Sequence, residues 1–267
     1  MVALGASATV LSKVAKMAKD PASDIESICA LLKNDASLVG DIIRISNSFF
    51  YAASEPHSNL QSAVSYIGVR EVIRVVNLSL SRQLFARDLV SYGIPADDYW
   101  RSSIAAALVM ETLAKQARLD VEDAYTIGII HAVGKVLIDR VVQEKSPELR
   151  WDRVQAVEVW ERDTVGFDFA DTGAMIAERW LFPFQTCDVI HCQLNPEMAV
   201  IPVSLLGALQ FTLRLLAMTG TDFAAKDWLV AEDDPYVKAA GLTPIFVDRM
   251  VTDCQEKYQA IQQAVCV

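Results

Sequence analysis

The sequence predicts an all-α protein. Apolar residues recur at intervals of three and four along nearly the whole chain, which is the spacing of buried helix faces. We find no alternating segments joined by an Asn-Gly or Asp-Gly turn that would indicate a β-hairpin. With 267 residues, of which 52% are hydrophobic, the chain has enough material for one large domain or two small ones.

Two helices are indicated in the N-terminal part. The order Ser23-Asp-Ile-Glu26 matches a capping box, in which a hydroxyl accepts from a free amide and a carboxylate reaches back, so a helix should start there. A second helix should start at Val69, because apolar residues then form one stripe with charged residues elsewhere. The stripe consists of Val72, Ile73, Val76, Leu80 and Leu84.

A turn signal divides the chain. Ser91-Tyr-Gly-Ile-Pro95 combines a glycine suited to a left-handed stop with a proline that can restart a helix. We therefore predict two helical halves, residues 1–92 and 93–267. No low-complexity linker separates them, so we expect them to pack closely as one unit.

Further helix starts are expected in the second half. Ser146-Pro147 and Thr243-Pro244 each place a capping hydroxyl before a proline at the first helical position. The uncharged stretch between Glu197 and Arg214 is shorter than the roughly 20 apolar residues that a membrane span needs. It is interpreted as a buried helix.

Charge and cysteine usage restrict the partners and the compartment. A net charge of −10 repels phosphate backbones and anionic lipid, so neither nucleic acid nor membrane is expected as a partner. Five cysteines, with no secretion signal ahead of them, favour reduced thiols. The predicted location is the cytoplasm.

Several catalytic motifs are missing from the sequence. It lacks a phosphate-binding Gly-x-x-x-x-Gly-Lys loop, a Gly-x-Ser-x-Gly elbow and a His-Glu-x-x-His helix. Cys187 and His191 share a helix face, with Cys192 about 100° further round, yet this spacing matches no zinc signature. We interpret them as two buried thiols and a histidine at the end of a helix, and predict neither metal nor cofactor.

Two groups are candidates for a ligand or interaction surface. Arg70 and Arg74 lie one helical turn apart and are suited to clamp a phosphate, although such pairs usually meet acidic neighbours. The segment after residue 46 ends in three aromatic side chains of the kind that anchors interfaces, with core packing as the competing interpretation. That cluster comprises Asn47, Phe49, Phe50 and Tyr51.

The segment Ile127–Asp139 resembles the helical core of an HD-type phosphohydrolase with one change: Ala132 follows His131 where the paired aspartate would stand. A methyl group cannot bind a divalent cation as a carboxylate does. This position argues against metal catalysis.

An ordered set of motifs resembles the HDOD family over nearly the whole chain. The resemblance implies an all-α, multi-helix HDOD fold, with an N-terminal helical bundle packed on an HD-like helical half. The family is similar in fold to HD phosphohydrolases and is regarded as a regulatory or interaction module of bacterial signalling proteins. The matching segments are Leu32–Leu38, Ile42–Ser48, Ala63–Gly68, Tyr99–Ala105, Gly128–Lys135, Gly173–Pro183 and Val189–Cys192.

The sequence departs from the metal-binding pattern that this resemblance implies. Ser102 and Phe169 stand where histidines are expected, Cys192 replaces the second of two frequent histidines, and Gln210 lies near an expected aspartate. His131 and His191 remain, which is fewer than the three or more protein ligands of a catalytic site. The vestigial positions are Ser102, His131, Ala132, Phe169, His191 and Cys192.

We therefore expect a non-catalytic signalling module that acts on one or more signalling proteins. In one alternative it is a sensor that takes a small effector in the cleft between its halves. In another it is a divergent metal phosphohydrolase that recruits His131, His191 and either Asp168 or Asp171. The sequence identifies neither the partner nor the oligomeric state.

Overall fold

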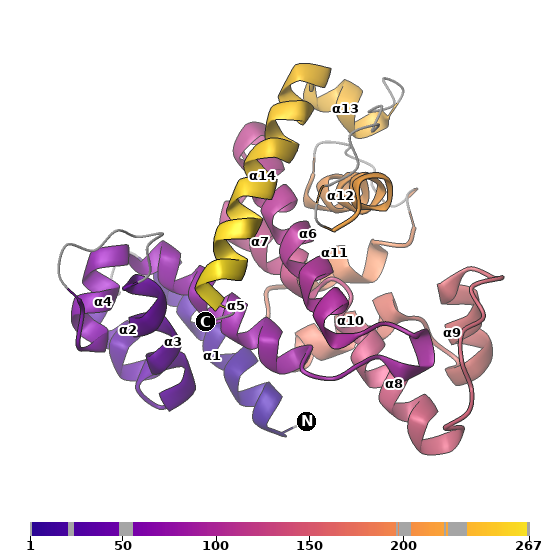
Figure 1. Ribbon diagram of the computed structural model, residues 1–267, viewed down its shortest axis with the longest axis horizontal. Coiled ribbons are helices and arrows are strands. Elements are labelled where there is room, and N and C mark those ends of the chain that lie inside the picture. Colours follow the sequence, from indigo (N-terminus) through magenta and orange to yellow (C-terminus); the bar gives the residue numbers. More distant parts are fainter. Residues whose placement is uncertain are drawn as a thin grey trace. The chain divides into compact units, whose positions relative to one another are not determined.

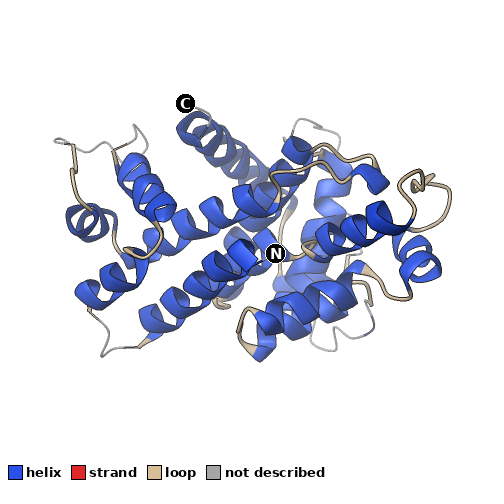
Figure 2. Ribbon diagram, turned by 90° about the horizontal axis from the view of Figure 1, so that it is seen from below, coloured by secondary structure: helices blue, strands red, loops and turns tan. Residues whose placement is uncertain are grey.

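The computed structural model describes residues 2–20, 24–47, 56–195, 197, 204–221, 223 and 234–265. Over these residues it is built of helices and contains no strand, as Figure 2 shows, apart from an isolated bridge between Leu89 and Ile94. The all-α prediction is confirmed. No helix in the described ranges is long and apolar enough to cross a membrane.

The chain forms two compact units, one of residues 1–83 with 257–267 and the other of residues 84–256. The sequence analysis divides the chain at residues 92 and 93, at the turn that contains Gly93, and that division stays a prediction. That glycine does adopt a left-handed φ of 62°, but it ends a short 3-10 turn within the second unit.

The first unit is a small helical bundle. In it α2 contacts α1 and α4, and α3 contacts α4, around buried Leu32, Ile42 and Val64. Its helices are α1 (Val2–Lys19), α2 (Ile25–Leu32), α3 (Ala36–Ser46), α4 (Leu60–Ile67) and α5 (Val69–Leu84), joined by the last residues of α14 (Pro244–Val265).

Two sequence predictions fall in this unit. The expected start near residue 24 is confirmed, but the cap is Asp24, whose side chain accepts from the amide of Ser27 at 2.7 Å; Ser23 lies outside the described residues. On α5 the predicted stripe residues Val72, Ile73 and Val76 are buried, but Val75, Asn77 and Ser79 are buried too, so the helix is covered on more than the one predicted side.

The second unit is organised around α6, a long helix that packs against α7 and α12 (Figure 1). A second group forms where α10 packs against α8 and α11. The elements are η1 (Val90–Tyr92), α6 (Ala96–Ala117), α7 (Val121–Ile130), α8 (Gly134–Lys145), α9 (Val157–Val165), α10 (Phe169–Arg179), α11 (Phe184–Cys192), α12 (Leu205–Thr219), α13 (Pro235–Ala240) and most of α14.

Of the helix starts expected here, one is confirmed and one is wrong. Thr243 Oγ1 accepts from the amide of Phe246 at 3.2 Å and α14 starts at Pro244. No helix starts at Pro147, because the segment between α8 and α9 is held as a loop: the amide of Trp151 donates to the carbonyl of Ser91 at 2.7 Å, and the Arg150 guanidinium donates to the carbonyl of Pro147. The bond to Ser91 is a tertiary one and competes with helical bonding, while the bond within residues 147–150 is local.

The uncharged stretch before Arg214 forms the start of α12, which begins after the Ser204 cap. Leu205, Ala208 and Leu209 are buried there, so the interpretation as a buried helix is confirmed from residue 205 onward. Residues 198–203 lie outside the described ranges.

Candidate functional site

Two of the vestigial positions, His131 and Ala132, lie at the junction of α7 and α8, and two glycines permit that junction. A Cβ on Gly128 would meet the Cα of Ala107 on α6 at 2.4 Å, and one on Gly134 would meet the carbonyl oxygen of Phe169 on α10 at 2.1 Å. Both distances are shorter than any side chain tolerates. The glycines therefore let α7 lie against α6 and α8 against α10, with residues 131–133 as the turn between them.

His131 ends α7 and is buried, with 5% of its surface exposed. Its Nδ1 lies 2.8 Å from the carbonyl oxygen of Gly128, so Nδ1 carries the proton that this hydrogen bond requires. Burial lowers the pKa of His131 to about 4, and the nearby Lys135 ammonium acts in the same direction. The imidazole is neutral and held against its own helix.

Both carbonyl groups at the vestigial His-Asp pair accept hydrogen bonds from side chains of other helices. The Tyr99 hydroxyl on α6 donates to the carbonyl oxygen of Ala132. The Gln193 amide, just after α11, donates to the carbonyl oxygens of His131 and Ile190, each at 2.8 Å. The backbone here is fixed from two sides, and the Ala132 methyl group is buried.

Phe169 fills another vestigial position with an aromatic ring. It is the first residue of α10 and is buried, and its amide donates to Oε2 of Glu161 at 2.7 Å. The Nζ of Lys135 lies 4.4 Å from the centre of its ring. The amino group of Lys135 thus lies over the face of an aromatic ring.

Glu161 on α9 is a fully buried carboxyl group that sequence reasoning missed. Its Oε1 accepts from the Tyr92 hydroxyl at 2.7 Å. Burial raises the pKa of Glu161 to about 7, against the opposing effects of Tyr92, the Phe169 amide and Lys135. Burial also lowers the pKa of Lys135 and raises that of Tyr92. Lys135 is the last residue of the HDOD-like segment Gly128–Lys135, but no sequence pattern links it to Glu161 or Tyr92.

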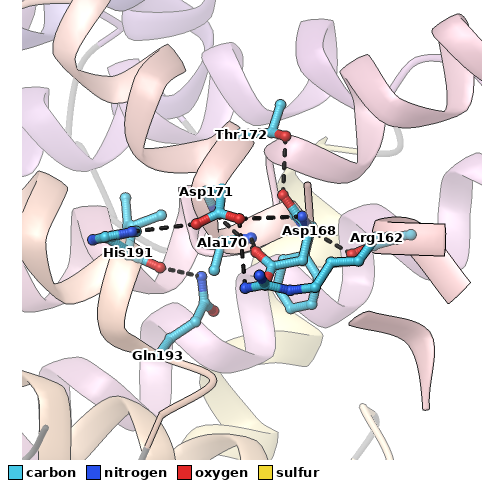
Figure 3. A network of polar contacts seen from close by, with 10 residues as sticks. Arg162, Asp168, Ala170, Asp171, Thr172, His191 and Gln193 are labelled. Carbon is cyan, nitrogen blue, oxygen red and sulfur yellow. Dashed lines mark hydrogen bonds and ion pairs between the residues drawn. The ribbon is translucent and has the colours of Figure 1, made fainter. Parts of the chain in front are cut away.

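A second polar network lies at the start of α10 (Figure 3). Asp168 caps the helix, accepting from the amides of Ala170 and Asp171 at 2.9 Å, and it also binds the Arg162 guanidinium at 2.5 Å. Asp171 lies between this group and His191, whose Nε2 is 3.2 Å from Asp171 Oδ1. The structure thus brings together His191 and Asp171, as the hydrolase alternative requires, but Arg162 and the helix cap already engage both carboxylates.

The residues that the structure describes do not form a site for a catalytic divalent metal. Across the described ranges, no three side chains of His, Cys, Asp or Glu are grouped so that they could hold one. Ser102 is half-buried on α6 and Cys192 is buried on α11. Burial raises the pKa of the Cys192 and Cys187 thiols, which disfavours the thiolate that metals bind.

The two candidate surfaces of the first unit are described only in part. Arg74 forms an ion pair with Glu71 at 2.8 Å, and Arg70 is exposed one turn earlier on α5. The Asn47 side chain is bonded to the backbone of His57: its Nδ2 donates to the His57 carbonyl at 2.9 Å and its Oδ1 accepts from the His57 amide at 2.7 Å. Phe49, Phe50 and Tyr51 lie outside the described residues. A binding role for either surface stays a prediction.

Gln210, near the position where an aspartate is expected, is buried on α12, and its Nε2 has no hydrogen-bond partner among the described residues. An amide nitrogen is a donor and binds no metal cation.

Comparison with known proteins gives a family match and several similar folds. The HDOD domain matches residues 4–196 of this chain. Among curated proteins, an uncharacterized protein of Treponema pallidum is 23% identical over 214 residues, which are 77% of this chain and 41% of that protein. The chain thus spans less than half the length of this relative.

Solved structures with the same fold are also similar to this chain. An HDOD domain protein of unknown function from Geobacter sulfurreducens is 18% identical, with a TM-score of 0.71, 97% of this chain covered and 92% of that one. A protein of Marinobacter aquaeolei, provisionally described as a signal transduction protein, is 21% identical with a TM-score of 0.68 and coverages of 96% and 57%. A protein of Shewanella amazonensis, provisionally described as a phosphohydrolase, is 19% identical with a TM-score of 0.68. The match covers 96% of this chain and 91% of that one.

Proposed function

Because the chain belongs to the HDOD domain family, we propose that it is a non-catalytic regulatory module of bacterial signal transduction, which acts by binding a partner protein or a small effector. Its place is the cytoplasm, and its partners are signalling proteins. The related proteins are named both as signal transduction proteins and as phosphohydrolases, so the residues of the site have to decide between the two classes.

The proposal rests on the contacts that residues 131 and 132, the vestigial His-Asp pair, make in the structure. An HD-type metal site needs an imidazole and a carboxylate directed at one cation. Here the His131 ring binds the Gly128 carbonyl, a buried methyl group stands at position 132, and Tyr99 and Gln193 occupy the adjacent carbonyl groups. These contacts stabilise the fold at the place where an enzyme would keep open coordination positions.

The hydrolase alternative would need a site at His191 and Asp171. His191 is exposed, and its partner Asp171 also lies 3.5 Å from the Arg162 guanidinium. A cation there would meet a positive charge and would have to break a helix cap. We therefore favour the regulatory function.

The experiment that tests the proposal is metal analysis of the purified, untagged protein by inductively coupled plasma mass spectrometry, together with hydrolysis of bis-p-nitrophenyl phosphate in added Mn²⁺. We expect metal well below one ion per chain and no hydrolysis above the no-protein rate. His131→Ala and His191→Ala variants serve as controls. Near-stoichiometric iron, manganese, nickel or zinc that is lost in His131→Ala, together with hydrolysis, would overturn the proposal.

A further inference from the structure

The hairpin of α10 and α11 exposes three large apolar side chains. Met175 on α10, Leu181 in the connecting turn and Phe184 at the start of α11 are 66%, 66% and 82% exposed. Side chains of this size are normally buried, and scattered single examples need no explanation. These three lie within ten residues of one another on two helices that pack together, so they form a group.

The group lies on one side of the hairpin. Asp171 and His191 face each other at 3.2 Å (Figure 3). Their side chains are 31% and 58% exposed, so the pair lies on the outer side where the two helices meet. Met175 is one turn after Asp171 on α10, and Asp188 and Phe184 are one and two turns before His191 on α11, so they continue the same two stripes. We call Met175, Leu181, Phe184, Glu178 and Asp188 the hairpin face.

Leu181 is held there at a conformational cost. Its φ is +64°, in the left-handed region that glycine or asparagine adopts with less strain. Its amide donates to the carbonyl of Glu178 at 2.9 Å, and the next amide, that of Phe182, donates to the carbonyl of Ala177 at 3.1 Å, which terminates α10. A helix stop of this kind does not require a leucine, and exposure adds a second cost at the same residue.

The charge around the apolar group is mainly acidic. Glu178 and Asp188 are exposed on the two helices, and Glu178 lies close enough to α11 to raise the pKa of the Cys187 thiol. Arg179 is exposed next to Glu178 on α10 and contributes the opposite charge. The chain as a whole carries −10, so a partner with positive charge is attracted both by the face and by the surrounding molecule.

We propose that the hairpin face binds a basic amphipathic helix of a partner protein. The apolar side of that helix would cover Met175, Leu181 and Phe184, and its lysines or arginines would meet Glu178 and Asp188. The inference rests on the proposed function, because it gives the regulatory module the surface through which it acts.

The test uses two synthetic helical peptides with the same leucine positions, one with lysine and the other with glutamate at the polar positions. Binding of each labelled peptide to the full chain is followed by fluorescence anisotropy at two salt concentrations. We expect the lysine peptide to bind, the glutamate peptide to bind at least about tenfold more weakly, and added salt to weaken binding.

Variants locate the binding. Met175→Ser with Phe184→Ser should weaken the lysine peptide about tenfold or more, since truncated anchors commonly cost that much. Leu181→Asn removes an apolar side chain from the hairpin face, so it should weaken binding. Because asparagine adopts the left-handed region with less strain than leucine, the melting temperature should not fall. Ile245→Ser, at an equally exposed apolar side chain (82%) on α14, is the control and should change nothing.

The following results would overturn the inference. They are equal affinity for both peptides, an equal loss in Ile245→Ser, or unchanged binding in both hairpin variants. If the chain self-associates in sedimentation experiments and the Met175→Ser, Phe184→Ser variant does not, the hairpin face binds a second copy of the chain instead. Binding to vesicles that the same variant abolishes would assign it to a membrane surface.

These outcomes are separate from the failure of the proposed function. Metal-dependent hydrolysis would refute the regulatory function whatever the peptides do. An inactive, metal-free protein whose hairpin variants bind as the wild type does would refute only the hairpin face.

Discussion

The side-chain amide of Gln193 lies 2.8 Å from the carbonyl oxygen of His131 and joins the end of α11 to the end of α7. It also donates to Ile190, and it is buried. One side chain thereby closes the vestigial site from the side of α11, and the consequences of its loss can be measured.

Replacing Gln193 with leucine keeps the volume and removes both donors. We expect the free energy of unfolding to fall by about 2 kcal/mol, because two buried carbonyl groups lose a partner. Urea denaturation measures this. Gln185→Leu, at an exposed position of α11, is the control and should stay within about 0.5 kcal/mol of the wild type. An equal effect of the two substitutions would contradict the role of Gln193.

Restoring the aspartate of the His-Asp pair should not restore a metal site. In Ala132→Asp the new carboxylate is buried, while the His131 ring stays bound to Gly128. We expect the free energy of unfolding to fall by about 2–4 kcal/mol at pH 7, and by less at acid pH, where the carboxyl group is neutral. We expect no bound metal. Ala132→Asn introduces a side chain of similar size that carries no charge, so its effect on the free energy of unfolding should not depend on pH. Stoichiometric metal in Ala132→Asp would show that the neighbouring side chains still converge.

His131 should remain neutral over the physiological range. Its pKa falls from 6.5 to about 4 on folding, so it contributes stability that is present above pH 6.5 and is lost as the pH falls through 4. The NMR shift of its imidazole carbon should therefore be constant from pH 8 down to about pH 5. A midpoint near 6.5 would mean that the ring is not buried as described.

Glu161 should make the protein less stable at alkaline pH. Its pKa rises from 4.5 to about 7, so its contribution is fully present below pH 4.5 and is lost as the pH rises through 7. Relative to Glu161→Gln, whose amide does not titrate, the wild type should lose up to about 3 kcal/mol between pH 4.5 and 8. Thermal denaturation across this range measures the difference. Glu148→Gln, in the exposed loop, should give the wild-type profile.

The close approach of α8 to α10 should not tolerate a methyl group. Gly134→Ala places a Cβ 2.1 Å from the Phe169 carbonyl oxygen, and we expect a loss of about 3 kcal/mol or more, because backbone has to move. Gly40→Ala is the matched control. Nothing lies within 4 Å of its added Cβ on α3, so a gain of about 0.5–1 kcal/mol is expected. Chemical denaturation of both variants measures the contrast.

Local signals in the sequence predicted the helices well where no tertiary bond competes. The burial of Val72, Ile73 and Val76 on α5 and the Thr243 cap of α14 are confirmed, because periodicity and capping are properties of neighbouring residues. The start expected at Pro147 is wrong for the opposite reason: Ser91, distant in sequence, takes the amide of Trp151.

The vestigial site shows the same difference between what residue type determines and what tertiary contacts determine. That Ala132 and Ser102 are poor metal ligands follows from residue type, and the sequence alone determined it, as it determined the all-α class and the family. Where the remaining groups point was decided only by the tertiary structure. Glu161, Tyr92 and Lys135 come from three separate segments, and their perturbed pKa values arise from burial, which no local pattern encodes. The hairpin face also depends on exposure, and exposure exists only once the helices have packed.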